Sequence, residues 1–131
     1  MNIVLDTNII ISALWSSGHT ITKILEAVIG GHFTVCYDFR IIDEYIRVMH
    51  YPKFDFKEEE ISAILNPLIK NGISVIADSL DSITFPDETD KKFYEVAVAA
   101  SAVLVTGNIK HFTDDGIAMK PADFFEKYLT K

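Results

Sequence analysis

Acidic side chains placed directly after apolar segments are the residues of this sequence that could carry out chemistry. Asp6 interrupts an apolar run between Ile3-Val4-Leu5 and Ile9-Ile10-Ile11. Carboxylates brought together from several segments offer hard oxygen ligands, which suit Mg²⁺ or Mn²⁺ rather than Zn²⁺. The candidate ligands and supporting polar residues are Asp6, Asn8, Glu44, Asp87, Asp90, Thr106 and Asn108. Such a set favours metal-assisted hydrolysis of a phosphate ester.

Other kinds of catalytic site lack the residues that they need. The four histidines, His19, His32, His50 and His111, show no zinc-ligand spacing. The sequence has no glycine-rich phosphate loop, no Gly-x-Ser-x-Gly elbow and no paired cysteine and histidine. The single cysteine, Cys36, lies in an apolar run and is expected to be a buried thiol.

Each candidate also has a structural explanation, which the residue taken alone leaves open. Asp6 and Asn8 are residue types that cap helices. The acids from Asp87 to Asp90 suit a helix start, where they complement the helix dipole. Glu44 could be a solvated helix-edge residue, and Asn108 an ordinary turn residue. Taken together, the candidate residues favour a functional site, because independent helix caps have no reason to share one end of a sheet.

Apolar segments rich in β-branched residues alternate with segments of helical spacing. The predicted strands are residues 3–5, 33–37, 73–77, 102–105 and 117–119. Helices are predicted to begin near residue 9, to span 21–29, 42–49, 61–69 and 93–100, and to begin again at residue 121. This alternation predicts one three-layer α/β domain over residues 1–131, with a mostly parallel sheet. Because ligands bind at the carboxyl ends of such strands, the polar residues there are expected to converge.

The composition limits the class of protein. The 131 residues are 49% hydrophobic, which is typical of one folded domain. No window reaches the roughly 18 apolar residues of a membrane helix, and the N-terminus lacks an export signal, so we expect a cytoplasmic protein without membrane association. The net charge of −7 argues against broad electrostatic binding of nucleic acid. It is compatible with a nucleic-acid enzyme whose carboxylates bind divalent cations, since the cations reverse the local charge.

Three segments resemble the PIN-domain nucleases. Asp6-Thr-Asn-Ile9, with Ser12 following, resembles their opening after an N-terminal strand, and Asp43-Glu44 is similar to their second acidic position. The segment PDETDKKFYEVAVAASAVLVTGNIKHF resembles their most diagnostic stretch, in which an acid begins a small-residue helix that leads into a strand ending in Val-Thr-Gly-Asn. The resemblance runs from about Met1 to Phe112 and depends on the order and separation of these motifs.

The resemblance implies a Mg²⁺- or Mn²⁺-dependent ribonuclease, often the toxin of a prokaryotic toxin–antitoxin pair. RNA and an antitoxin protein are then the expected partners. By matching position, the acidic metal ligands would be Asp6, Glu44 and Asp90, with Asp87 as an additional acid. Thr106 and Asn108 match the family's Thr-x-Asp turn, and Asn8 would support Asp6. Asn108 adds no negative charge there, so the number of metal ions stays open. The lysines that either line an RNA path or lie on ordinary surface are Lys53, Lys91, Lys92 and Lys110.

Two other functions fit part of the sequence. A phosphatase of the haloacid-dehalogenase type begins with a strand ending in Asp-x-Asp, but here Asn8 stands at the third position. A degenerate PIN scaffold would bind a partner without catalysis. Apolar residues in 61–69, around Trp15 and in Phe124-Phe125-Tyr128 predict a homodimer or an antitoxin contact, although core burial explains them equally well.

Overall fold

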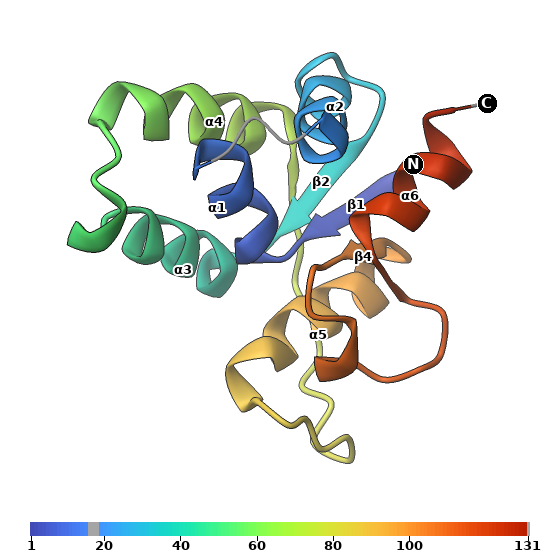
Figure 1. The fold of residues 1–131 in the computed structure, drawn as a ribbon. Coiled ribbons are helices and arrows are strands. Elements are labelled where there is room, and N and C mark those ends of the chain that lie inside the picture. Colours follow the sequence, from blue (N-terminus) through green and yellow to red (C-terminus); the bar gives the residue numbers. More distant parts are fainter. Residues whose placement is uncertain (16–18, 131) are drawn as a thin grey trace.

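The structure is a computed structural model that describes residues 1–15 and 19–130 (Figure 1). Within these ranges the chain forms a five-stranded sheet of order β3-β2-β1-β4-β5, and every neighbouring pair is parallel. The strands are β1 (Asn2–Leu5), β2 (Thr34–Tyr37), β3 (Ile73–Ser74), β4 (Val103–Val105) and β5 (Ala118–Met119).

Helices cover both faces of this sheet. The α-helices in the described ranges are α1 (Thr7–Trp15), α2 (His19–Ile29), α3 (Phe39–Met49), α4 (Glu58–Asn71), α5 (Lys91–Ala100) and α6 (Pro121–Tyr128). The 3-10 helices there are η1 (Pro52–Phe54), η2 (Glu88–Asp90) and η3 (Ile109–His111). In Figure 1, α1, α2 and α4 lie on one side of the strands and α5 on the other, packed against β1, β2 and β4. The prediction of an α/β fold is confirmed.

The central strands are the most apolar ones. Ile3, Val4 and Leu5 of β1 are fully buried, and so are Leu104 and Val105 of β4. Removing such side chains from water contributes roughly 1.5–3 kcal/mol each. Continuous apolar strands therefore occupy the middle of the sheet, where both faces are covered by helices.

Two element boundaries differ from the sequence prediction. The strand predicted over residues 73–77 is wrong beyond Ser74, although the Val75 amide still donates to the Tyr37 carbonyl oxygen over 2.7 Å. The Ile76 side chain is 97% exposed, because this segment lies at a sheet edge and has no face to cover. In addition, α1 begins at Thr7, two residues before the predicted start.

The apolar residues proposed as a surplus for a dimer interface lie mostly in the core. Ile61, Leu65 and Leu68 of α4 are buried, and so is Phe124 of α6. Trp15 differs from them, since its side chain is 64% exposed. Core burial therefore accounts for these residues of α4 and α6, and a homodimer stays a prediction. As for membranes, no helix within 1–15 and 19–130 combines the length and the apolar character needed to cross one.

Candidate active site

Asp6 lies at the carboxyl end of β1, directly beside the end of β4. The two strands pair with Leu5 opposite Val105, and the Asp6 amide donates to the Val105 carbonyl oxygen over 3.0 Å. The Asp6 side chain is only 5% exposed. Its Oδ2 accepts hydrogen bonds from the Thr106 hydroxyl over 2.7 Å and from Asn8 Nδ2 over 3.3 Å. Two strand ends thus hold one buried carboxylate in a fixed orientation.

Burial makes Asp6 hard to ionise. The pKa of Asp6 is raised from its usual 3.8 to about 6. Burial is the largest cause, and the charges of the nearby acids Asp90 and Glu44 contribute less. Hydrogen bonds from the Thr106 side chain and the Thr7 backbone amide act in the opposite direction. The Thr7 amide belongs to the first turn of α1, so Asp6 also has part of the cap role expected of it. The charges of two further acids, Asp90 and Glu44, also act on it, which a cap does not require.

The turn after β4 is fastened to Asp6 and to the start of α1. The Thr106 oxygen that donates to Asp6 also accepts from the Asn108 amide over 3.0 Å. The Gly107 amide donates to Asn8 Oδ1 over 3.2 Å. Asn108 is exposed and takes part through its backbone rather than its amide side chain. The supporting positions expected for Asn8 and Thr106 therefore coincide with real contacts, whereas a ligand role for the Asn108 side chain stays a prediction.

Glu44 reaches the same region from α3. Asp38 caps this helix by accepting from the amides of Arg40 and Ile41 over 3.0 and 3.2 Å. The Thr7 hydroxyl donates to Glu44 Oε2, and Lys92 Nζ lies 2.7 Å from Glu44 Oε1. Both side chains of this ion pair are only 14% exposed. The neighbouring hydroxyl of Tyr45 is buried and donates to the Leu5 carbonyl oxygen, which ties α3 to the end of β1.

Asp90 and Asp87 lie on the segment that leads into α5, and they differ in environment. Burial raises the pKa of Asp90, and the charges of Asp87 and Glu44 add to this effect against the hydrogen bond with His111. That bond joins Asp90 Oδ2 to His111 Nδ1 over 3.0 Å. Asp87 is exposed and accepts from the Thr89 amide and hydroxyl over 2.9 and 2.6 Å, which lowers its pKa. Asp87 therefore caps η2.

The carboxylates gather from three elements without forming a ready-made metal cage. Across residues 1–15 and 19–130, no three His, Cys, Asp or Glu side chains converge closely enough to hold an ion as they stand. Two of the acids have cationic or ionisable partners instead, since Glu44 pairs with Lys92 and Asp90 with His111. The donors are nevertheless all carboxylate oxygens, as a hard divalent cation requires. A cation there would also offset the repulsion that raises the pKa of Asp6.

An ion network between α3 and α5, with two shielded acids around the half-exposed Arg40, supports the helices on which these acids depend, and it was not predicted from the sequence. Arg40 Nη1 lies 2.8 Å from Glu95 Oε1, and Arg40 Nη2 lies 2.7 Å from Asp38 Oδ2. Glu95 is 4% exposed and also accepts from the Leu80 amide over 2.7 Å. The network fixes α3, which carries Glu44, to α5. The available signal was an acid at Glu95 within the apolar stretch of a helix.

The expected basic residues divide into two groups. Lys92 contacts Glu44, and Lys110 lies in η3, directly beside His111. Lys53 instead lies over the Phe54 ring, with Nζ 5.2 Å from its centroid. Phe112, which follows His111, is buried and packs edge-to-face against Phe85.

Comparison with known proteins gives two positive findings. A family model described as "PIN domain" matches residues 2–110. The fold is also similar to a chain in the crystal structure of VapBC2 from Rickettsia felis bound to a DNA fragment from their promoter, with a TM-score of 0.63. That match covers 92% of this chain and 98% of that chain at 18% sequence identity, so it concerns the fold alone. No curated protein matches the sequence.

Proposed function

This chain belongs to the PIN-domain family, and from that premise we propose that it is a metal-dependent endoribonuclease that hydrolyses phosphodiester bonds of RNA. PIN domains are generally nucleases that act with divalent metal ions. The observation that carries the proposal is the buried Asp6 carboxylate at the meeting point of β1 and β4, with Glu44 and Asp90 close enough to raise its pKa. A structural cap alone explains only one of these three acids.

The proposed metal ligands are Asp6, Glu44 and Asp90, with Asp87 as a further acid at the margin. Bound Mg²⁺ or Mn²⁺ would supply Lewis-acid stabilisation of the phosphoryl group and a water that ionises near neutral pH. The Thr106 hydroxyl and Asn8 amide orient Asp6, and the Thr7 hydroxyl orients Glu44. Asn108, exposed and tied by its backbone amide to Thr106, would orient water through its side-chain amide.

Lys92 gives the site a positive charge of its own. Its ammonium lies 2.7 Å from Glu44 Oε1, in the first turn of α5. This charge offsets part of the repulsion between the three acids and an approaching phosphate. In this proposal Lys92 attracts the substrate phosphate and offsets part of its charge.

The biological setting that we propose is a toxin–antitoxin pair in the cytoplasm. The support is the likeness of the fold to a chain of the VapBC2 structure, which spans nearly the full length of both chains. In this setting a small antitoxin protein would bind the chain and restrain its cleavage of RNA.

Cleavage of single-stranded RNA by the purified chain tests the enzymatic part. We expect the wild type to cut with Mg²⁺ or Mn²⁺, and Asp6→Asn and Asp90→Asn to lose about 100-fold or more of the rate. The matched control is Asp123→Asn, which alters an exposed acid on α6 and should cut like the wild type. Because water is the nucleophile, the products should carry no 2′,3′-cyclic phosphate. Failure of the wild type to cut RNA with either ion would refute the proposal.

A non-catalytic PIN scaffold is the second candidate function. It is favoured by the absence of a ready-made three-ligand cage within the described part of the chain. For a scaffold, Asp6→Asn should leave partner binding unchanged and Mn²⁺ should bind neither form. The family assignment argues against the haloacid-dehalogenase alternative, because that class needs a second acid where this chain has Asn8.

A further inference from the structure

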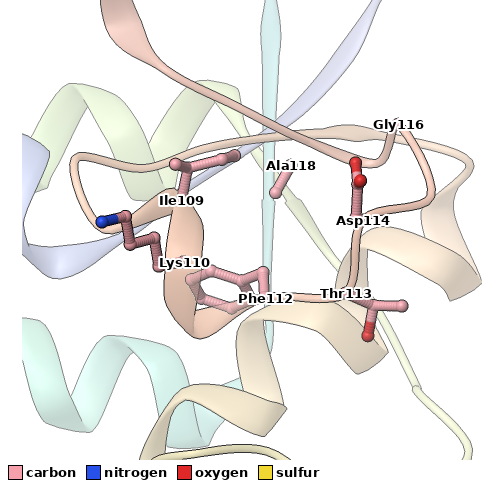
Figure 2. Close-up of a pocket in the computed structure, with 7 residues that line it drawn as sticks. All are labelled: Ile109, Lys110, Phe112, Thr113, Asp114, Gly116 and Ala118. Atoms are coloured by element: carbon pink, nitrogen blue, oxygen red, sulfur yellow. The ribbon is translucent and has the colours of Figure 1, made fainter.

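A pocket of about 430 Å³ opens in the loop that follows β4 (Figure 2). Its volume falls within the roughly 300–1,000 Å³ that is typical of small-ligand sites. Ile109, Phe112 and Ala118 supply an apolar lining. Figure 2 shows Lys110 and Asp114 on opposite sides of this lining. The pocket thus combines an apolar surface with one cationic and one anionic group.

The wall of this pocket is tied to the body of the protein. Asp115 Oδ1 accepts from the Ile117 amide over 3.0 Å, and the Asp115 amide donates to the Thr113 carbonyl oxygen over 2.9 Å. The hydroxyl of the buried Tyr94, on α5, donates to Asp115 Oδ2. Hydrogen bonding to Asp115 raises the pKa of Tyr94 to about 12, so the donor keeps its proton at physiological pH. The pocket is therefore a built feature of the fold.

The lining of a second pocket, of about 300 Å³, shares residues with the first pocket and includes neighbours of the acidic site. Its lining shares Ile109 and Lys110 with the first pocket and also includes Asn108 and His111. The amide of Asn108 bonds to the Thr106 hydroxyl that holds Asp6, and His111 bonds to Asp90. The loop that lines both pockets is therefore tied by hydrogen bonds to two of the proposed metal ligands, Asp6 and Asp90.

The charges around these two pockets suit a nucleotide. Lys110 and Lys120 flank the smaller pocket, and within the described residues neither forms an ion pair with a carboxylate. In a chain of net charge −7, these two lysines place positive charge around a pocket whose lining also includes His111, the partner of Asp90. Asp114 is exposed on the far side of the larger pocket. A carboxylate there repels phosphate but accepts hydrogen bonds from the N–H groups of a base.

We propose that the larger pocket holds one unpaired base of the RNA strand next to the bond that is cut. Lys110 and Lys120 then contact the adjacent phosphate, and Asp114 reads the edge of the base. This inference rests on the proposed ribonuclease function and adds a specificity subsite to it. A single strand suits the pocket, because only an unstacked base can turn its edge into it.

The chemistry of Asp114 predicts which base is preferred. Guanine presents two adjacent donors, N1–H and N2–H, which match the two oxygens of a carboxylate. Uracil presents one N–H between two carbonyl oxygens, which a carboxylate repels. A bidentate contact of this kind is worth about tenfold or more in discrimination between bases. We therefore expect guanine to be favoured over uracil at one position beside the cut.

The test uses short unpaired RNAs that differ in one base at each position around the cut. Cleavage rates are measured with the full chain, and binding is measured by fluorescence anisotropy in an Asp6→Asn background. Asp114→Asn should reduce the preference for guanine over uracil about tenfold, because it removes the bidentate acceptor for guanine and relieves the repulsion of uracil. Lys110→Gln should weaken binding to all RNAs and lower the salt dependence by about 0.7 in log–log slope. The matched controls, Asp123→Asn and Lys70→Gln, should change neither quantity.

A third variant, Ala118→Phe, fills the pocket and should lower the affinity for RNA at least about tenfold. If it does not fold, the exposed substitutions at Asp114 and Lys110 still decide the question. An enzyme that cuts RNA with the same base preference in the wild type and in Asp114→Asn overturns the subsite and leaves the ribonuclease function standing. A wild type that cuts no RNA overturns both. Variants that alter only binding to a partner protein also overturn the subsite, because the pocket then docks a protein.

Discussion

Replacing Asp6 by asparagine is expected to stabilise the folded protein at neutral pH even though it removes a proposed metal ligand. Asparagine has the same shape, and its Oδ1 can accept the hydrogen bond that the Thr106 hydroxyl now donates to the carboxylate. What the substitution removes is a buried negative charge next to Glu44 and Asp90. Functional sites commonly carry a stability cost of this kind.

The direction of the pH dependence follows from the pKa of Asp6 in the two states. It is about 6 in the folded protein, against the usual 3.8 in an unfolded chain. Below pH 3.8 the group is protonated in both states and contributes nothing. Between these two values the unfolded chain loses its proton first, so stability falls as the pH rises. Well above pH 6 Asp6 is charged in both states, and the full loss of unfolding free energy, the penalty for burying this charge, remains.

The size of the penalty comes from the same difference. About two pKa units at about 1.4 kcal/mol each amount to about 3 kcal/mol of unfolding free energy. No large discount for solvent applies, because Asp6 is only 5% exposed. Asp6→Asn should therefore be more stable than the wild type by up to about 3 kcal/mol at pH 8, and by much less at pH 4.

Urea unfolding followed by far-UV circular dichroism measures this difference between pH 4 and pH 8 in the presence of a chelator. Asp123→Asn serves as the control, since its exposed carboxylate should leave the wild-type pH profile unchanged. The reasoning is refuted if Asp6→Asn is no more stable than the wild type at pH 8. It is equally refuted if the two profiles run parallel from pH 4 to pH 7.

Three further predictions concern the residues that support the site. Thr106→Val removes the hydroxyl that joins Asp6 to the turn, so the free energy of unfolding in urea should fall by about 1–3 kcal/mol. The same change should raise the pKa of Asp6, because the lost hydrogen bond lowers it, and an unchanged titration of Asp6 contradicts this. Glu95→Ala takes the acceptor away from the Leu80 amide and one of two carboxylate partners from the half-exposed Arg40, so it should cost about 1–3 kcal/mol. Hydrogen exchange at the Leu80 amide should become faster, and full protection of that amide argues against the network. Gly72→Ala places a methyl group 2.5 Å from two backbone carbonyl oxygens and should cost at least about 1–3 kcal/mol, whereas a neutral effect in thermal unfolding contradicts the close packing.

The sequence was most informative about the candidate site residues that directly follow strands. Asp6 and Thr106 each follow a continuous apolar strand, and such strands occupy the centre of a parallel sheet. Their ends then lie side by side, as the register of Leu5 with Val105 shows. Local pattern was sufficient here because the strands are nearly all apolar and the polar residue that follows each one is unambiguous.

Contacts between helices could not be read from local pattern. The pairing of Lys92 with Glu44 and of Arg40 with Glu95 depends on how α3 and α5 lie across the sheet, which periodicity does not determine. The overlong strand at residues 73–77 has a similar cause. Its β-branched residues have strand propensity, but an edge strand extends only as far as its neighbour can pair, and propensity carries no information about the neighbour.

The central claim is that Asp6, Glu44 and Asp90 jointly hold a divalent cation, and titration of Mn²⁺ into the purified chain by calorimetry tests it most directly. The account predicts one or more Mn²⁺ sites in the wild type and in Asp123→Asn. It predicts affinity at least about tenfold weaker in Asp6→Asn and in Glu44→Gln. Equal Mn²⁺ binding by all four proteins, or none by the wild type, would contradict the account.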